Sequence, residues 1–321
     1  MRARFHIPDF WDHYGINVVF MSMLENCPDF FREGVEIASV YGSFPQAVWN
    51  GGRNIRGRYD DQKAQKIMHI FNEHGIPLRF TFTNPVLKEE HLYDPICNRI
   101  MKMADNGLNE VIVNSPLLED YIRSEYPNYK ITSSTCRMIT DIEKVKEEME
   151  KDYHILVLDY NLNNKFDLIE QIPHKERIEV LVNSCCDPGC PNRGNHYRLI
   201  GQDMIYYTDH MSVMPDKPFD INNYSTENED NNVKCHARER FVFDIFKLST
   251  CVTPDAIWEK YIPMGFEQFK IEGRTSSNLY IVETYMQYMI KPEIRDQARI
   301  MFLQNLDRNG IFKLEHIRRK Q

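Results

Sequence analysis

Short apolar runs alternate with segments of helical periodicity along most of the chain. The runs are rich in Val, Ile and Leu and nearly continuous in apolar residues, as is typical of strands that are buried on both faces. From Gly15 onward the predicted strands are Ile16–Met21, Val35–Tyr41, Leu78–Thr83, Glu110–Asn114, Lys130–Ser134, His154–Tyr160, Ile178–Asn183 and Gln268–Glu272. The pattern therefore predicts an α/β protein with parallel strands joined by helices.

Helices are predicted between these strands by their own period. Asp94 followed by Pro95 indicates one helix start, because Asp caps the end and Pro suits the first turn. Asp141 indicates another. Eight strand–helix repeats favour closure into a (β/α)8 TIM-type barrel, and an open doubly wound sheet is the alternative. A further apolar stripe, at helical spacing, consists of Ala64, Ile67, Met68 and Phe71.

The alternation is interrupted once, before the last strand. Residues 211–234 are rich in Asp, Asn and Pro without periodicity, which predicts a long polar insertion over one end of the barrel. After the last strand, Leu279–Ile290 and Pro292–Leu306 predict C-terminal helices within about 277–306. No second domain is indicated, so residues 1–321 are predicted to form one barrel domain.

Composition narrows the class of protein. The chain has 321 residues, of which 42% are hydrophobic and 27% charged, as is usual for a folded globular domain. Its formal charge of −8 disfavours a general nucleic-acid backbone binder, although a local basic patch stays open. No apolar stretch is long enough to span a bilayer, so we predict no membrane association. The basic N-terminus lacks the features of a signal peptide, which predicts a cytoplasmic protein with reduced cysteines.

Polar side chains follow several of the predicted strands. In a barrel these strand ends meet at the carboxyl-terminal mouth, where catalytic residues lie. Each could instead cap the next helix or form its turn, but together they favour a polar pocket. The segments are Thr83-Asn84, Asn114-Ser115, Ser133-Ser134-Thr135, Asp159-Tyr160-Asn161 and Asn183-Ser184.

Cysteines cluster directly after the seventh predicted strand. Cys186 and Cys190 have a C-x3-C spacing, short enough for one loop to surround a metal. Adjacent Cys185 is expected to be a spectator, because successive side chains diverge. Cys235 follows the polar insertion and can return to the same rim, and Cys251 is a more distant candidate ligand.

The spacing also limits the kind of metal site. A radical S-adenosylmethionine enzyme would need a cysteine three residues after Cys190, where this chain has Arg193. An iron–sulfur cluster and zinc are both compatible with these thiols. Buried free thiols without any metal are the structural alternative.

One further segment carries a family resemblance. Lys270-Ile271-Glu272-Gly273-Arg274 closely resembles the strand motif of peptidase family U32, the collagenase-like proteins, and the run from Glu179 to Cys186 resembles the strand that leads into the first cluster cysteine of that family. The motif-level likeness extends from about Ile178 to Arg274. The C-x3-C spacing departs from the better-known members, so a divergent branch is indicated.

The resemblance implies a cofactor and a chemistry. Several members of this family resemble iron–sulfur proteins that hold a 4Fe-4S cluster on four cysteines and support oxygen-independent hydroxylation. Carried over, the ligands are Cys186, Cys190, Cys235 and, less directly, Cys251. Cys185, Cys136 or an open iron position are the alternatives for the fourth ligand. Such chemistry is compatible with an electron-transfer partner.

Five polar residues are candidates for the reaction and for substrate binding. Glu272 and Arg274 are predicted to be catalytic, since Arg offers a planar fork for carboxylate or phosphate and Glu can transfer a proton. A structural ion pair is the alternative for these two. Arg53, Arg193 and His196 are predicted to bind substrate, and His196 could equally be a surface histidine.

Three functions follow from these patterns. The first is an iron–sulfur oxidoreductase or hydroxylase-like enzyme acting on a small anionic molecule. The second is a U32-type peptidase or other hydrolase, with zinc or without metal, although the chain shows neither a zinc-protease helix motif nor a Gly-x-Ser-x-Gly elbow. The third is an RNA-binding or partner-binding accessory protein with a structural cluster.

Overall fold

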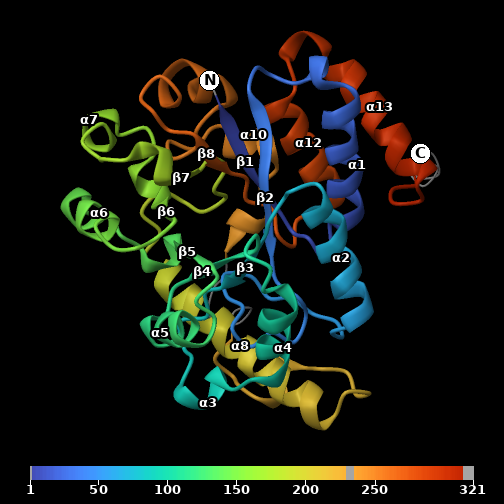
Figure 1. Cartoon of the computed structure of the whole chain (residues 1–321), viewed down its shortest axis with the longest axis vertical. Helices are drawn as coiled ribbons and strands as arrows, with labels where there is room; N and C mark the ends of the chain where they lie inside the picture. Colours follow the sequence, from blue (N-terminus) through green and yellow to red (C-terminus); the bar gives the residue numbers. More distant parts are fainter. Residues whose placement is uncertain (1, 229–234, 314–321) are drawn as a thin grey trace.

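A computed structural model of the chain describes residues 2–228 and 235–313. Eight parallel strands form a closed barrel in chain order, with β8 pairing to β1 (Figure 1). The (β/α)8 prediction is confirmed, and the open-sheet alternative is wrong. The strands are Ala3–Pro8 (β1), Val35–Gly42 (β2), Leu78–Phe82 (β3), Glu110–Val113 (β4), Lys130–Ser133 (β5), Ile155–Leu158 (β6), Ile178–Leu181 (β7) and Gln268–Lys270 (β8).

Helices follow the strands and form the outer layer, with longer ones on the side of β1 and β2 (Figure 1). Asp94 and Asp141 accept hydrogen bonds from backbone N–H groups of the first turns of α4 and α6, as their sequence positions predict. The helices are Tyr14–Asn26 (α1), Asp61–Glu73 (α2), Glu89–Leu92 (α3), Pro95–Ala104 (α4), Pro116–Glu125 (α5), Ile142–Met149 (α6), Phe166–Ile169 (α7), Arg193–Val213 (α8), Val242–Ile245 (α10), Pro254–Ala256 (α11), Asn278–Met289 (α12) and Arg295–Arg308 (α13).

The first predicted strand is wrong. Ile16–Met21 lies inside α1, and β1 is formed by the basic N-terminal segment instead. The apolar run is helical because its buried residues, among them Ile16, Phe20 and Met23, recur at helical spacing. In β1 the apolar side chains of Phe5 and Ile7 alternate with polar ones, which is the period of a strand.

The interruption and the C-terminal helices lie close to their predicted places. Residues 211–213 complete α8, a short 3-10 turn covers Ile221–Asn223, and residues 229–234 of the predicted insertion lie outside the described part. Helices α12 and α13 confirm the predicted C-terminal pair. Among the described residues, none of the helices combines the length and the apolarity that crossing a bilayer requires.

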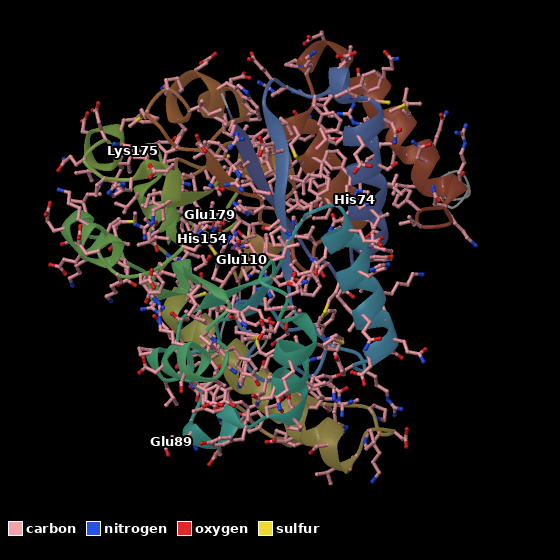
Figure 2. All side chains as sticks on the ribbon, in the orientation of Figure 1. His74, Glu89, Glu110, His154, Lys175 and Glu179 are labelled. Atoms are coloured by element: carbon pink, nitrogen blue, oxygen red, sulfur yellow. The ribbon has the colours of Figure 1, made fainter. Side chains whose placement is uncertain are left out.

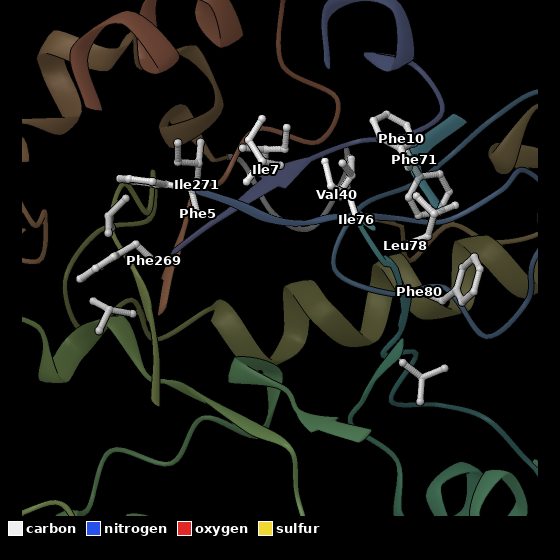
Figure 3. Close-up of a cluster of buried hydrophobic side chains, with 14 of the residues drawn as sticks. Phe5, Ile7, Phe10, Val40, Phe71, Ile76, Leu78, Phe80, Phe269 and Ile271 are labelled. Atoms are coloured by element: carbon white, nitrogen blue, oxygen red, sulfur yellow. The ribbon is translucent and has the colours of Figure 1, made fainter. Parts of the chain in front are cut away.

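The hydrophobic core lies between the strands and the surrounding helices. Phe5, Ile7 and Leu78 point outward from their strands and are fully buried, and Figure 3 shows them with Phe269 and Ile271 of the barrel's closing edge. Burial of each such side chain contributes about 1.5–3 kcal/mol. The core therefore stabilises the outside of the barrel and leaves its interior free for polar residues.

The interior of the barrel carries a buried charge cluster. Arg79, fully buried, donates a hydrogen bond to Glu179 and lies 3.1 Å from Glu110 (Nε to Oε2). Lys270 lies 3.1 Å from the other oxygen of Glu179. Figure 2 labels both glutamates among the strands. Because a buried charge requires a partner, these strands are tied together by matched ions where most barrels use aliphatic layers.

Helix α8 crosses the mouth of the barrel. The Asn84 side chain, after β3, donates a hydrogen bond to the Gly201 carbonyl at 3.1 Å, and a Cβ at Gly201 would lie 2.2 Å from Asn84 Oδ1. Tyr207 donates to the Gly57 carbonyl in the loop after β2, at 2.8 Å. In Figure 1 α8, in yellow, runs below the strands. The helix therefore covers the carboxyl-terminal end of the barrel.

His6 gives the fold a defined sensitivity to acid. Arg79 Nη1 donates to His6 Nδ1 at 2.9 Å, so a neutral ring carries its proton on Nε2 and donates to Gln268 Oε1 at 3.0 Å. Burial, opposed by Glu179 and reinforced by Arg79, lowers the pKa of His6 from 6.5 to about 3. Between about pH 6.5 and pH 3 the unfolded chain therefore binds a proton at His6 that the folded chain does not.

We expect the free energy of unfolding to fall on acidification through this window, by up to about 1.4 kcal/mol per pH unit from this one group. Urea unfolding of wild type and His6→Gln at pH 7 and pH 5 measures it. The variant should lose less stability between the two pH values than wild type does. His69→Gln, at an exposed site, is the matched control and should behave as wild type. Equal losses in wild type and His6→Gln would contradict the assignment.

Candidate functional site

Two connected cavities lie at the mouth beneath α8. The inner cavity, about 80 Å³, lies within the barrel and is lined by strand residues such as Tyr41, Thr81 and Lys270. The rim cavity, about 310 Å³, lies between the loops after β2, β7 and β8. Both cavities are lined by the same three charged residues, Arg53, Glu272 and Arg274.

Cys185 and Cys186 leave β7 at the boundary of these cavities. Cys185 lines the rim cavity and Cys186 the inner cavity. The Cys185 thiol donates to Glu272 Oε1 at 3.6 Å and so keeps its proton. The neighbouring Cys185 thiol, with help from Arg53 and Arg193, lowers the pKa of Cys186 to about 6. Interaction with Cys186, followed by burial, raises the pKa of Cys185. The lowered pKa of Cys186 favours its thiolate form at neutral pH.

Glu272 is fixed by its neighbours from two strands. The Arg53 guanidinium donates to its Oε1, and the Cys185 backbone N–H donates to its Oε2 at 3.2 Å. The Asn183 side chain joins the ends of β7 and β8, since it accepts from Glu272 N at 2.6 Å and donates to Glu272 O at 2.9 Å. Two residues that were predicted for different roles, Glu272 and Arg53, are thus paired over the cavities, and in the described structure the ion pair of Glu272 is with Arg53, not with Arg274.

Arg193 is held at the start of α8. It donates to Asp159 Oδ2 at 2.5 Å, to Thr135 O at 3.0 Å and to the Tyr197 hydroxyl at 3.0 Å. Its guanidinium also lies 4.2 Å from the Tyr160 ring centroid. These contacts occupy most of its donors, so Arg193 acts on the site chiefly through its charge, which favours the Cys186 thiolate.

The other predicted site residues are placed in different surroundings. Arg274 lines both cavities. His196 is buried on α8 with its ring parallel to Tyr197, and it is not among the described residues that line either cavity. Cys190 and Cys235 are partly exposed, and neither is among the described residues that line the two cavities.

Cys251 lies in the core, away from the mouth. It is 4% exposed, its thiol lies 3.5 Å from the Tyr288 hydroxyl, and burial raises its pKa to about 11. Across residues 2–228 and 235–313, no group of three or more His, Cys, Asp or Glu side chains is placed to hold one metal ion. The four predicted cysteines therefore do not form a ready ligand set, and their assignment remains a prediction.

The inner cavity is lined by Tyr160 and Tyr197 together with Cys136. Sequence reasoning missed Tyr197, whereas it named Tyr160 within a polar strand end and Cys136 as an alternative ligand. Burial raises the pKa of both tyrosines, so both stay protonated. Within the described part of the chain, the buried Tyr160 hydroxyl has no hydrogen-bond partner. The position of Tyr160 directly after β6 was an available indication, but the missing partner depends on the fold.

Comparisons with known proteins found similarity to a curated relative and to a solved structure. No protein-family model matches the chain. It is similar to "Uncharacterized protease MJ1657" from Methanocaldococcus jannaschii, with 23% identity over 171 residues, 51% of this chain and 50% of the relative. The match thus spans about half the length of that curated relative. A solved structure, "The Structure of the U32 Peptidase Mk0906", aligns over 84% of this chain and 92% of that chain, with 13% identity and a TM-score of 0.48. The name of the relative is compatible with the resemblance to U32 peptidases that residues 270–274 carry.

Proposed function

We propose that the protein is a U32-type, peptidase-like hydrolase that cleaves an amide bond in a small anionic substrate, with Cys186 as nucleophile. One observation carries the proposal: a cysteine whose pKa is lowered to about 6 lines a small cavity at the mouth of a barrel, beside tyrosine, arginine and glutamate side chains. A thiolate of this kind is the reactive form of cysteine. The relative from Methanocaldococcus jannaschii is described as a protease, which favours hydrolysis over the other candidates.

The side chains around Cys186 suit this reaction. Attack of the Cys186 sulfur on the substrate carbonyl carbon forms a C–S bond and a tetrahedral oxyanion. The Tyr160 hydroxyl, protonated and without a partner in the described structure, can donate to that oxygen. The C–N bond then breaks, and the Cys185 thiol gives its proton to the leaving amine.

Hydrolysis of the thioester restores the site. Glu272, which accepts hydrogen bonds from Cys185, takes a proton from the attacking water and passes it to the Cys185 sulfur. The C–S bond breaks, the acid product leaves, and Cys186 returns to its thiolate. No oxidant or reductant is consumed in this cycle.

The dimensions of the site set the size of the substrate. Cavities of about 310 Å³ and 80 Å³ accommodate a small molecule or a few residues of peptide. Because α8 covers the mouth, a folded protein substrate does not reach Cys186. The cationic side chains Arg53, Arg193 and Arg274 around the cavities favour an anion.

A second candidate is the iron–sulfur enzyme that the family resemblance implies. Cys136, Cys185 and Cys186 all lie along the two cavities, which brings thiols from the loops after β5 and β7 to one mouth. With Cys186, Cys190 and Cys235 as ligands, a 4Fe-4S cluster would supply redox chemistry and require an electron-transfer partner. An RNA-binding or partner-binding role for such a cluster protein is the third candidate, which the formal charge of −8 disfavours.

Metal analysis separates these candidates. Protein purified without oxygen, with cluster-assembly proteins co-expressed, should contain far less than one iron and one sulfide per chain, and amine release from a panel of small acylated amino acids should survive a chelator. Stoichiometric iron and sulfide, with visible absorbance and no hydrolysis, would instead establish the cluster candidate. One zinc per chain, together with hydrolysis that a chelator abolishes, would mean that the metal and not the Cys186 thiolate is the reactive group.

A further inference from the structure

The rim cavity contains a buried cation without an acidic partner. Arg274 is 8% exposed and donates to three neutral acceptors: Asn50 Oδ1 at 2.9 Å, Thr81 Oγ1 at 2.6 Å and Gly51 O at 2.8 Å. Among the described residues, no carboxylate lies within 4.0 Å of its guanidinium. A buried charge held by neutral groups alone is costly unless a ligand completes it.

The other cations that line this cavity are matched. Arg53 is paired with Glu272, and Arg240 is paired with Asp187. Asp9 accepts backbone N–H bonds from Trp11 and Asp12 on Oδ1, and its buried Oδ2 faces His13 and makes no hydrogen bond in the described structure. Asp9 does not line the rim cavity, so within the described structure Arg274 is the arginine of that lining without an ion pair.

The two residues after Arg274 present hydroxyl groups to the same cavity. Thr275 has φ of 65°, a left-handed conformation that is strained for a β-branched residue. Thr275 and Ser276 are both among the residues that line the rim cavity. In the described part of the chain neither hydroxyl makes a hydrogen bond, so both remain available to a ligand.

The strained turn at Thr275 is stabilised by a hydrogen bond from His13, the residue that precedes α1. His13 Nε2 lies 3.0 Å from the Ser276 carbonyl oxygen, to which only a protonated nitrogen can donate. The Ser276 backbone N–H donates to Gly273 O at 3.0 Å. These contacts hold Thr275 in place, and strain that surrounding structure maintains is most often found at binding and catalytic positions.

We infer that Arg274, Thr275 and Ser276 form a subsite for one carboxylate group of the substrate. A guanidinium fork and two hydroxyls match the planar pair of carboxylate oxygens. One unmatched positive charge balances a monoanion, whereas a phosphate dianion would leave a buried excess of negative charge. The subsite thus selects carboxylate over phosphate.

The subsite also indicates a substrate class, an inference that rests on the proposed hydrolysis. The rim and inner cavities share Arg274, so a carboxylate seated there leaves the neighbouring amide in the inner cavity beside Cys186. N-acylated amino acids and short peptides with a free C-terminal carboxylate have this arrangement. The scissile bond is then the amide next to the C-terminal carboxylate.

The subsite can be tested without catalysis, in the Cys186→Ser protein. Calorimetric titration with N-benzoylglycine should show binding that its methyl ester loses by at least tenfold, and inorganic phosphate should bind more weakly than the acid. Arg274→Lys should weaken binding of the acid about tenfold or more, and Ser276→Ala by several-fold. Equal binding of acid and ester, or tighter binding of phosphate, would overturn the assignment.

Thr275→Gly distinguishes a binding role from a structural one. Glycine accepts the left-handed φ, so this variant should melt at a higher temperature than its parent while binding the acid several-fold more weakly. A higher melting temperature with unchanged affinity would mean that Thr275 has no part in the subsite. If the acid binds as expected but the wild-type protein hydrolyses no acylated amino acid, the subsite stands and the proposed reaction fails.

Discussion

Changing Cys186 to serine is expected to abolish fast alkylation by iodoacetamide at pH 7 and to lower amide hydrolysis by about a thousandfold or more. The physical reason is the lowered pKa of about 6, which makes this sulfur a thiolate while an ordinary thiol is protonated. In wild type the alkylation rate should rise with pH through an inflection near 6. Mass spectrometry of the alkylated peptide identifies the residue.

Cys185→Ser is the matched control. The two cysteines are adjacent, but the Cys185 thiol is protonated and donates to Glu272. Serine keeps a donor at this position, so Cys186 should still be alkylated, with its inflection moved upward because Cys185 contributes most to the lowered pKa. In wild type, labelling of Cys185 in place of Cys186, or an inflection near the ordinary value of about 8.5, would remove the basis for a thiolate nucleophile.

Arrangement of the strands could be predicted from local pattern alone. A continuous apolar run such as Ile155–Leu158 is unambiguous, because a strand buried on both faces favours apolar residues throughout, and the run Ile178–Leu181 is interrupted only by Glu179. The first strand was misplaced since Ala3–Pro8 alternates polar and apolar residues. That alternation reflects a charged barrel interior, and nothing in the local sequence announces that His6 faces Arg79.

The candidate site residues could be predicted only in part, because local sequence gives the position of a residue relative to a strand but not its contacts across the barrel. Glu272 and Arg274 could be placed at the mouth because they follow a strand at alternate positions. The lowered pKa of Cys186, to which Arg53 and Arg193 contribute, and the buried Tyr160 hydroxyl without a partner in the described structure, depend on contacts between different strand ends. Those contacts are set by strand register and by α8, which a periodicity argument does not supply.

The charged interior links stability to the site. Lys270 belongs to the ion cluster through Glu179 and also lines the inner cavity above it. Arg79, which shares the Glu179 carboxylate with Lys270, lies deeper in the barrel and forms ion pairs with Glu179 and Glu110. Ions placed in this way hold the strands at fixed separation beneath the cavity, so loss of one member should affect both folding and the shape of the mouth.

Glu179→Ala is accordingly expected to destabilise the fold by about 3–5 kcal/mol, because it leaves Arg79 and Lys270 buried without their shared carboxylate. The melting temperature should fall by roughly 10 °C, as measured by calorimetry. Glu176→Ala, which removes the exposed glutamate just before β7, is the matched control and should change it little.

Arg79→Leu combined with Glu179→Leu tests the electrostatic cause. Removing both partners leaves one cation, Lys270, and one anion, Glu110, so the double variant should lose less stability than the sum of the two single variants. Losses that simply add would mean that packing, not the uncompensated charge, accounts for the effect of Glu179. The barrel interior would then be held by shape alone, and the ions beneath the mouth would serve the site without stabilising the strands.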